Sequence, residues 1–308
     1  MTVAHAQRYV GRFAPSPTGP LHFGSLIAAL ASYADARAAA GTWLLRIEDL
    51  DPPREPAGAA DQIVRTLERY GFQWDGAVMY QSQREPAYLA AFERLRLMDS
   101  IFPCRCSRLQ LRRGKTGAGG EQVYPGTCRE TVPRGAGPQA WRVKVDGTPV
   151  TFADRIQGTQ AQVLSRDIGD FVVRRADQRW AYQLAVVVDD SEQRITDIVR
   201  GADLLTSTPR QIWLQRQLGV PTPAYAHVPV VVNAIGEKLS KQTRASALAM
   251  TNPETALLAA WQFLGQRPPD SRPDDPQQFW DWAIPRWDLR AVPRAPALCA
   301  EADPPVAL

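Results

Sequence analysis

Residues 11–25 constrain the fold more than any other part of the chain, because they join the start of an apolar strand to a helix through a proline-rich turn. The three prolines fix φ and remove three backbone donors, and Gly19 and Gly24 lack the Cβ that would block close approach of a ligand. Residues 25–40 then read as a helix, which places His22 at a helix N-terminus, where free N–H groups favour phosphate. A crossover without a ligand would also use prolines and glycines, so the segment alone leaves the phosphate site open.

The pattern around this turn predicts an α/β protein. Residues 9–13 and 42–47 read as strands on either side of the first helix, and strand, helix, strand is the start of a parallel sheet. The sheet is expected to resume with a buried strand at 181–188, headed by Tyr182, with a strand at 196–199 and with an apolar run at 228–232. Further helices are expected at 59–70, 85–98, 209–218, 254–264 and 277–282, and the Pro- and Ala-rich end of the chain is expected to be an unpacked tail.

Residues 104 to about 140 break the apolar pattern with three cysteines, a Gly-rich stretch and basic residues, which indicates an insertion into the sheet domain. Short β-like runs follow at 141–145, 150–152 and 171–173. The predicted organisation is a first half of the sheet domain over 8–103, the insertion over 104–178, the second half over 179–232, and a small, mainly helical C-terminal domain over 233–308.

Length and composition bound the class of protein. A chain of 308 residues suggests about two domains, and its net charge of +4 permits an anionic partner without requiring one. No apolar run is long enough to span a membrane, and residues 1–8 do not read as a secretory signal. We therefore expect a cytoplasmic protein, and we expect a monomer.

A loop over residues 236–242 places Lys238 and Lys241 on either side of Ser240. In isolation a lysine pair of this kind is typical of a solvated turn. In this chain it follows the phosphate-site segment by more than 200 residues, and the two segments together resemble the paired signatures of class I aminoacyl-tRNA synthetases. The run at 17–24 resembles the first signature, with Ser25 in place of its second histidine, and residues 12–19 resemble the glutamyl branch of that family.

The resemblance implies a Rossmann-like catalytic domain that activates an amino acid with ATP and Mg²⁺. The carboxylate of the amino acid attacks the α-phosphate, and donors must meet the negative charge that gathers on the phosphate oxygens. His22 and Lys241 are the implied catalytic residues. The implied ATP-binding residues are Thr18, His22, Gly24, Lys238, Ser240 and Lys241.

The glutamyl branch implies glutamate as the amino acid. Glutamate has two carboxylates and one ammonium, so its pocket needs two cationic or donor groups and one acceptor. Glu48 is expected to take the ammonium at the carboxyl end of the second strand, where open α/β sheets place ligands. Which arginine holds the side-chain carboxylate stays open, although Arg200 is favoured. The implied glutamate-binding residues are Arg12, Ser16, Glu48, Tyr182 and Arg200.

Cys104, Cys106 and Cys128 form a candidate metal cluster in the insertion. Structural zinc requires four ligands, and none of the three histidines lies in the insertion. From the residues alone the fourth ligand could be Tyr124, Glu121, a water or Cys299, and three buried cysteines without a metal are the alternative. The resemblance implies Tyr124 as the fourth ligand of one structural Zn²⁺.

Only 66 residues follow Gln242, too few for the helical domains with which full-length glutamyl enzymes read the anticodon. The chain therefore resembles the truncated paralogues of the glutamyl branch, and residues 51–55 support that subgroup. The resemblance implies transfer of glutamate to the queuosine base at the wobble position of tRNA(Asp), with the basic insertion and the C-terminal segment gripping the RNA backbone. No residue is identified as the reader of queuosine.

Two other functions are compatible with the sequence. A truncated synthetase could charge the 3′ end of tRNA(Glu), and a catalytically silent, zinc-stabilised paralogue could bind RNA or regulate. The presence of both ATP signatures favours an enzyme, because a paralogue that only binds RNA does not need both signatures.

Overall fold

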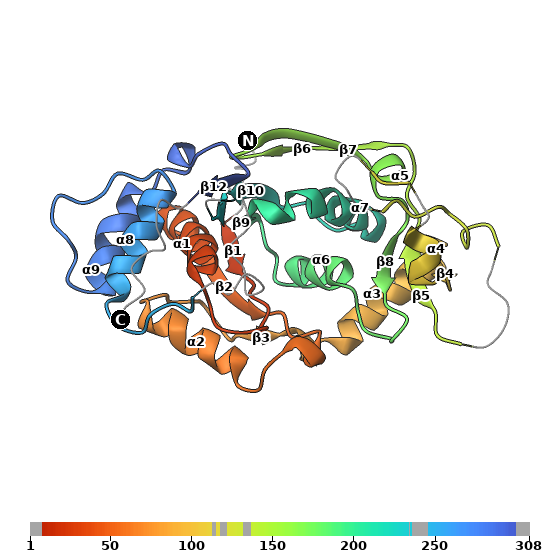
Figure 1. Cartoon of the computed structure of the whole chain (residues 1–308), viewed down its shortest axis with the longest axis horizontal. Helices are drawn as coiled ribbons and strands as arrows, with labels where there is room; N and C mark the ends of the chain where they lie inside the picture. The colour runs from red at the N-terminus through yellow and green to blue at the C-terminus, as the bar shows by residue number, and fades with distance from the viewer. Residues whose placement is uncertain are drawn as a thin grey trace, which may run out of the picture.

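The structure is a computed structural model that describes residues 8–112, 115–117, 122–131, 137–233, 235 and 246–299. The molecule is elongated (Figure 1), with two C-terminal helices at one end and an antiparallel sheet at the other. The parallel sheet and its helices lie between them. Among the described residues, no helix has the length and apolar character needed to cross a membrane.

The central sheet consists of two groups of strands. In the first, β1 (Val10–Phe13) pairs in parallel with β2 (Thr42–Ile47), and β2 pairs in parallel with β3 (Met79–Tyr80). In the second, β10 (Ala224–Val228) pairs in parallel with both β9 (Asp197–Gly201) and β6 (Pro149–Asp154), and β7 (Gly158–Val163) pairs antiparallel with β6. The parallel strands predicted at 9–13, 42–47 and 196–199 are confirmed.

Thr196 joins the two groups of strands. Its backbone N–H donates to Val10 O at 2.9 Å, and its hydroxyl accepts from Val10 N at 2.8 Å. β1 and β9 therefore lie side by side, although 183 residues separate the end of one from the start of the other. This junction brings the carboxyl ends of β1, β2, β9 and β10 to one edge of the sheet.

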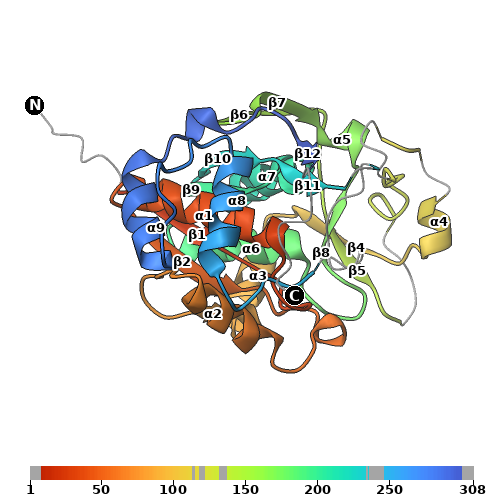
Figure 2. The ribbon, with the colours of Figure 1, turned by 60° about the vertical axis from the view of Figure 1, so that its left-hand side comes forward.

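The first helix, α1 (Phe23–Ala38), lies between the sheet and helix α8 (Pro253–Phe263), as the turned view shows (Figure 2). Most of its residues are buried, because the sheet covers one side and the C-terminal helices cover the other. Aromatic rings fix this packing. Tyr33 of α1 makes edge contacts with Trp43 of β2 and with Trp280 of α9 (Pro276–Ala283), with ring centroids 4.9 and 4.7 Å apart.

The remaining helices surround the sheet. All six helices predicted from the sequence, at 25–40, 59–70, 85–98, 209–218, 254–264 and 277–282, begin and end within one or two residues of the observed positions. The additional α-helices are α2 (Ala59–Arg69), α3 (Glu85–Leu97), α4 (Arg108–Arg112), α5 (Leu164–Asp167), α6 (Tyr182–Glu192) and α7 (Thr208–Leu218), and the 3-10 helices are η1 (Pro52–Arg54), η2 (Gln81–Gln83), η3 (Ala202–Ser207), η5 (Ile284–Arg286) and η6 (Leu289–Ala291).

The strand predicted at 181–188 is wrong, because these residues belong to helix α6. α6 packs against α3, α7 and β8, so apolar residues cover several of its faces and the helical period disappears from the sequence. Three consecutive valines added a β-like composition, and tertiary burial overrides that weak local preference. Tyr182 therefore heads a helix, and Asp190 lies inside the protein on that helix.

The cysteine-rich segment contributes to a separate antiparallel sheet. β5 (Ala140–Val143) pairs with both β4 (Ile101–Cys104) and β8 (Phe171–Arg174), which confirms the β-like runs at 141–145 and 171–173. The run at 150–152 lies in β6, which joins the central sheet. The domain limits given above stay a prediction.

The apolar run at 228–232 is divided, because Pro229 has no N–H with which to continue a ladder. β10 ends at Val228, and β11 (Val230–Val232) pairs in parallel with β12 (Ala297–Cys299). The prediction of an unpacked C-terminal tail is therefore wrong as far as Cys299. The short strand β12 anchors this part of the chain beside β11.

Candidate active site

A pocket of about 460 Å³ opens at the carboxyl ends of the parallel strands. Open α/β sheets bind ligands at this edge, because the loops that follow the strands converge there. Arg12 lies near the end of β1, Glu48 directly follows β2, Arg200 lies near the end of β9, and Val228 ends β10. The pocket brings together all five residues predicted to bind glutamate: Arg12, Ser16, Glu48, Tyr182 and Arg200.

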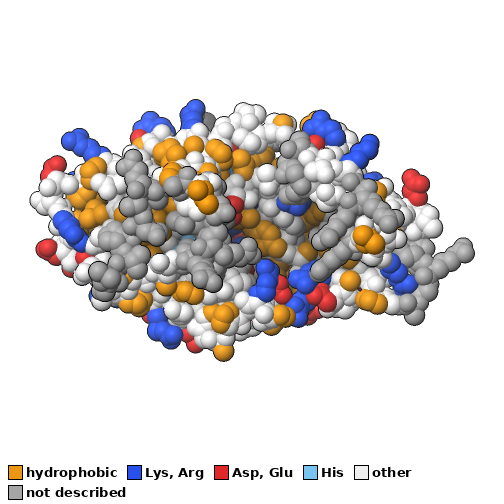
Figure 3. Space-filling view, in the orientation of Figure 1, with side chains coloured by type: hydrophobic (Ala, Val, Ile, Leu, Met, Phe, Trp, Pro, Cys, Tyr) orange, Lys and Arg blue, Asp and Glu red, His pale blue; other side chains and the backbone are white. Residues whose placement is uncertain are grey.

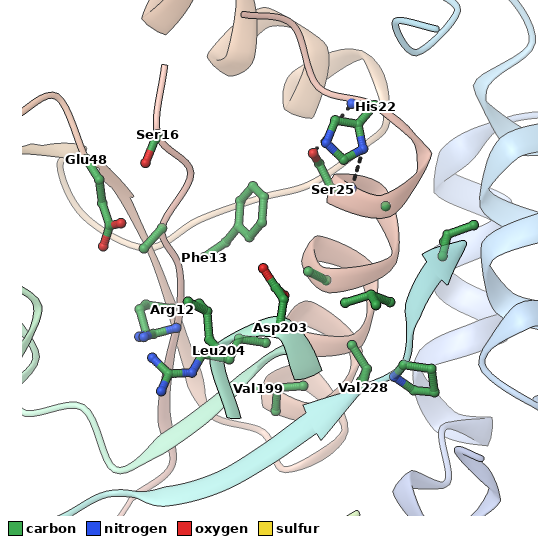
Figure 4. A pocket seen from close by; sticks show the side chains of 18 of the residues that line it. Arg12, Phe13, Ser16, His22, Ser25, Glu48, Val199, Asp203, Leu204 and Val228 are labelled. Atoms are coloured by element: carbon green, nitrogen blue, oxygen red, sulfur yellow. Dashed lines mark hydrogen bonds between the residues drawn. The ribbon is translucent and has the colours of Figure 1, made fainter. Parts of the chain in front are cut away.

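The two ends of the pocket differ in chemistry (Figure 4). Arg12, Ser16 and Glu48 lie on one side, while His22 and Ser25 lie across Phe13 on the other. The first side offers buried charges, and the second offers the N-terminus of a long helix. An amino acid and a nucleotide could therefore lie end to end in this pocket.

Asp190 of α6 fixes Arg12. It accepts from Arg12 Nε at 3.1 Å and from Arg46 Nη2 at 2.7 Å, and all three side chains are buried. Burial by itself raises the pKa of Asp190, but the two guanidinium groups outweigh it and hold that pKa below its usual range. An ionised Asp190 keeps both arginines in place, and it neutralises only one of their two charges.

Glu48 lines the same pocket, and its pKa is shifted in the opposite direction from that of Asp190. Burial raises the pKa of its carboxyl to about 7, against the opposing effect of Arg46 and Arg12. Arg46 Nη2 lies 3.8 Å from Glu48 Oε1. A ligand ammonium at this carboxyl would favour the ionised form, so Glu48 can act as the acceptor that an α-amino group requires.

Arg200 is a buried cation that has only neutral partners. Its Nη2 donates to Thr208 Oγ1 at 2.9 Å and to Gln211 Oε1 at 2.7 Å, and its Nε donates to His227 Nε2 at 3.1 Å. Its Nη1 is buried without a hydrogen-bond partner, and no carboxylate of the described residues forms an ion pair with it. A buried charge of this kind is costly without an anion, so the geometry favours an anionic ligand group here.

His227 orients the guanidinium of Arg200 through a hydrogen bond. Its Nδ1 lies 2.6 Å from Asp154 Oδ2, and both side chains are buried. Burial lowers the pKa of His227 to about 4 despite that carboxylate. The neutral ring therefore donates from Nδ1 to Asp154 and accepts at Nε2 from Arg200.

The other side of the pocket is the N-terminus of α1. His22 is its N-cap, and its Nδ1 accepts from Ser25 N at 3.3 Å. Gly24 also lines the pocket, and its approach by a nucleotide stays a prediction. Thr18 lies in a neighbouring pocket that shares Ser16, Glu48 and Tyr182 with the first. Lys238, Ser240 and Lys241 lie outside the described residues.

The three cysteines of the insertion converge. The sulfur atoms of Cys104, Cys106 and Cys128 all lie within 4.8 Å of one another. Tyr124 adds its hydroxyl, 3.5 Å from Cys104 Sγ and 3.9 Å from Cys106 Sγ. Cys106 and Cys128 Sγ are 3.5 Å apart, close to the separation of about 3.8 Å that tetrahedral Zn–S bonds of about 2.3 Å give.

The donor set of this cluster fits a zinc ion. Three thiolates and one phenol oxygen can converge on one centre, and Arg142 donates from Nε to Cys104 Sγ at 3.3 Å. Hydrogen bonds from Tyr124 and Arg142 lower the pKa of Cys104 against the effect of burial. Cys299 lies in β12, away from these ligands in the fold, and Glu121 lies outside the described residues.

The sequence matches the family of tRNA synthetases class I (E and Q), catalytic domain, over residues 9–261. The chain belongs to this family. A relative from Aromatoleum aromaticum, named glutamyl-Q tRNA(Asp) synthetase, is 56% identical over 290 residues, which cover 94% of this chain and 92% of the relative. A relative of the same name from Dechloromonas aromatica is 54% identical and covers 93% of this chain and 96% of its own length.

Solved structures of the class I family share the fold. The structure of a glutamate-tRNA synthetase from Elizabethkingia anophelis superposes with a TM-score of 0.80 at 24% identity, over 96% of this chain and 68% of the other. A glutamate tRNA ligase from Elizabethkingia meningosepticum, in complex with its amino acid, gives 0.79 at 24% identity over 94% of this chain and 67% of the other. These likenesses confirm the α/β, Rossmann-like fold class.

Sequence reasoning missed the residues that support the two arginines of the pocket, Arg12 and Arg200. Asp190 holds Arg12, and Asp154 holds His227 against Arg200. The Asp189–Asp190 pair at the end of an apolar run was a usable signal, because adjacent acids in such a run need buried partners. His227 gave no such signal, since its partner lies 73 residues away in another strand.

Proposed function

We propose that this chain is a ligase that activates glutamate with ATP and transfers it to the queuosine base at the wobble position of tRNA(Asp). The relatives that carry the name glutamyl-Q tRNA(Asp) synthetase support the acceptor, because they match this chain over nearly their whole length. The chemistry of the pocket supports glutamate as the amino acid that is activated.

One observation supports glutamate as the amino acid. Nη1 of Arg200 has no hydrogen-bond partner, and Arg200 lines the same pocket as Arg12 and Glu48. The charged side chains that line the pocket or support it bring four positive charges, from Arg12, Arg46, Arg54 and Arg200, and at most three negative ones, from Glu48, Asp190 and Asp203. The excess complements glutamate, whose net charge is −1. We assign the side-chain carboxylate to Arg200 and the ammonium to Glu48.

Ser16 and Tyr182 complete the proposed glutamate site. Both line the pocket beside Glu48, and their hydroxyl groups can donate to a carboxylate oxygen. Burial raises the pKa of Tyr182, which keeps its hydroxyl protonated and able to donate. Arg12, fixed by Asp190, is the second cation of the site.

In the first step, an oxygen of the glutamate α-carboxylate bonds to the α-phosphorus of ATP, and pyrophosphate leaves. The N-terminus of α1, with His22 and Gly24, supports binding of the phosphates, because its N–H groups point outward. We assign Lys238, Ser240 and Lys241 to the pyrophosphate side from the signature that they resemble. Mg²⁺ that arrives with ATP would neutralise part of the phosphate charge.

In the second step, a hydroxyl oxygen of the queuosine ring bonds to the activated carbonyl carbon, AMP leaves, and the hydroxyl proton is released. The product is an ester on the base. A tRNA partner favours a cytoplasmic location, and one chain supplies every residue assigned above, so the proposed reaction requires no second subunit.

We further propose that Cys104, Cys106, Tyr124 and Cys128 hold one structural Zn²⁺. The ion would cross-link β4 to the loop that carries Tyr124 and Cys128, in a part of the chain with little apolar core of its own. None of its ligands lines the pocket of Arg12 and Arg200, which supports a structural role.

The test combines labelled glutamate and ATP with four RNAs. These are tRNA(Asp) with queuosine, the same tRNA with guanosine at the wobble position, the queuosine form without its 3′-terminal adenosine, and tRNA(Glu). We expect label on both queuosine RNAs and on neither of the others. Label that depends on the 3′ adenosine, or that enters tRNA(Glu), would contradict the proposal in favour of 3′-end charging. Failure of glutamate-dependent pyrophosphate exchange would favour a silent paralogue.

A further inference from the structure

A second pocket of about 450 Å³ adjoins the first. The two share Ser16, Glu48, Arg54 and Tyr182, so the second opens directly onto the place assigned to glutamate. His22, Gly24 and Ser25 line only the first pocket, whereas Thr18, which the resemblance assigns to ATP, lines only the second. An acceptor in this second pocket could therefore meet the activated carbonyl without displacing the nucleotide.

One residue that lines the second pocket carries an unsatisfied hydrogen-bond acceptor. Gln81 lines the pocket and is only 1% exposed, and its Oε1 is buried without a hydrogen-bond partner. Its Nε2 donates to Asp189 Oδ2 at 2.8 Å. Because a carboxylate only accepts, this contact fixes the orientation of the amide and leaves Oε1 as the unpaired atom.

Asp189 is itself held by two further donors. Arg84 Nε lies 3.2 Å from its Oδ1, and Tyr88 donates from its hydroxyl to Oδ2 at 2.7 Å. Gln81 therefore sits on a rigid support. A buried acceptor that lacks a partner is unfavourable, so this pocket favours a ligand that brings a hydroxyl or ammonium donor.

The rim of the second pocket has the opposite character. Asp51 accepts from Arg54 Nε at 2.6 Å and from Arg179 Nη1 at 2.9 Å, and Arg175 Nη1 lies 3.5 Å away. Arg54 and Arg175 line the pocket, with side chains 70% and 43% exposed. Each guanidinium has five N–H donors, so Arg54, which pairs with Asp51, and Arg175, which pairs with Asp51 and Asp177, both keep N–H groups for phosphate oxygens.

Figure 3 shows Lys and Arg side chains next to Asp and Glu side chains along the lower margin of the central hollow on one face of the molecule. A face that combines exposed guanidinium groups with a recess suits a nucleotide within an RNA chain. Its phosphates would stay at the rim, and its base would enter the recess.

We propose that this second pocket receives the acceptor nucleoside, with the hydroxyl and ammonium groups of the queuosine side chain donating to Gln81 Oε1 and with Arg54 and Arg175 binding its flanking phosphates. The inference rests on the proposed function and adds the residues that recognise the acceptor. Gln81 and Arg175 line only the second pocket, so their effects separate from activation of glutamate.

The first test replaces Gln81 by methionine, which preserves volume and removes both the acceptor Oε1 and the Nε2 donor to Asp189. We expect kcat/KM for the queuosine anticodon stem-loop to fall on the order of ten-fold, because the hydrogen bond to Oε1 is lost, while glutamate-dependent pyrophosphate exchange stays within about three-fold. Gln83→Met, an exposed position in the same 3-10 helix, is the matched control. Unchanged transfer by Gln81→Met would overturn the assignment of Gln81.

The second test uses Arg175→Gln. It tests the second pocket independently if Gln81→Met impairs both transfer to RNA and pyrophosphate exchange. Loss of one phosphate contact should raise the KM for the stem-loop and lower the slope of log KM against log salt by about 0.7. Arg96→Gln, an exposed ion-paired arginine on α3, is its control. An unchanged slope would overturn the pocket assignment. Wild-type protein that exchanges pyrophosphate but transfers nothing to queuosine RNA would overturn the proposed function, and this inference with it.

Discussion

Arg200 donates from Nε to Nε2 of His227 over 3.1 Å, and His227 in turn contacts Asp154 from Nδ1 over 2.6 Å. The three residues come from β9, β10 and β6, which are neighbours in the sheet. The contact orients a guanidinium whose Nη1 has no partner. Ordering of that cation before glutamate arrives lowers the entropic cost of binding.

Replacement of His227 by leucine should disturb glutamate binding more than catalysis. Removal of the acceptor at Nε2 frees Arg200, and we expect the KM for glutamate in pyrophosphate exchange to rise about ten-fold, with a smaller change in kcat. His227→Gln, which can offer an amide oxygen near the same place, should recover part of the loss. Equal KM values in wild type and His227→Leu would show that His227 does not position Arg200.

Removal of the Arg200 charge should have a larger effect. For Arg200→Gln we expect the KM for glutamate to rise on the order of a hundred-fold or more, because loss of a buried ion pair costs about 3–5 kcal/mol. The KM for ATP should change little, since His22 and Gly24 lie on the other side of the pocket. A variant with normal glutamate KM would contradict the assignment of the side-chain carboxylate to Arg200.

The pH dependence of activation should report Glu48. Its pKa of about 7 means that the carboxyl is protonated and uncharged below pH 7 and ionised above it. Binding of the glutamate ammonium needs the ionised form, so kcat/KM for glutamate should fall about ten-fold per pH unit below 7. Glu48→Gln should give a low value that does not vary over pH 5.5–8. If kcat/KM fell equally below pH 7 in wild type and in Glu48→Gln, Glu48 would not be the group whose titration causes the fall.

The cysteine cluster should bind one zinc per chain. Cys106→Ser is expected to lose the metal, as measured by elemental analysis, and to lower Tm by about 2–4 °C for each kcal/mol of lost stability. Cys299→Ser is the matched control, because Cys299 lies in β12, outside the cluster. Full zinc content in Cys106→Ser would contradict the site.

Tyr124 is tested separately as the fourth ligand. Tyr124→Phe keeps the ring over which Arg142 stacks at 4.1 Å and removes only the hydroxyl. We expect zinc to pass to a chelator faster from this variant than from wild type. Equal rates of zinc loss would assign the fourth position to another group.

Much of the site could be predicted from the sequence because its residues lie in local signatures. Arg12, Ser16 and Glu48 lie near strand ends, and strand ends of a parallel sheet meet at one edge. Tyr182 was assigned to the site from the resemblance, but the strand that it was expected to head is helix α6, whose several buried faces hide the helical period in the sequence. The tertiary contacts of Asp190 and of the Asp154–His227 pair have no local pattern, and only the fold reveals them.

The most direct test of the central claim is the chemical identity of the glutamylated nucleoside. After reaction of the wild-type protein with ATP, glutamate and tRNA(Asp) that contains queuosine, the RNA is digested to nucleosides under mildly acidic conditions that preserve esters. Mass spectrometry should then find queuosine heavier by one glutamyl group. Glutamate on the 3′-terminal adenosine, or on no nucleoside while pyrophosphate exchange proceeds, would contradict the account.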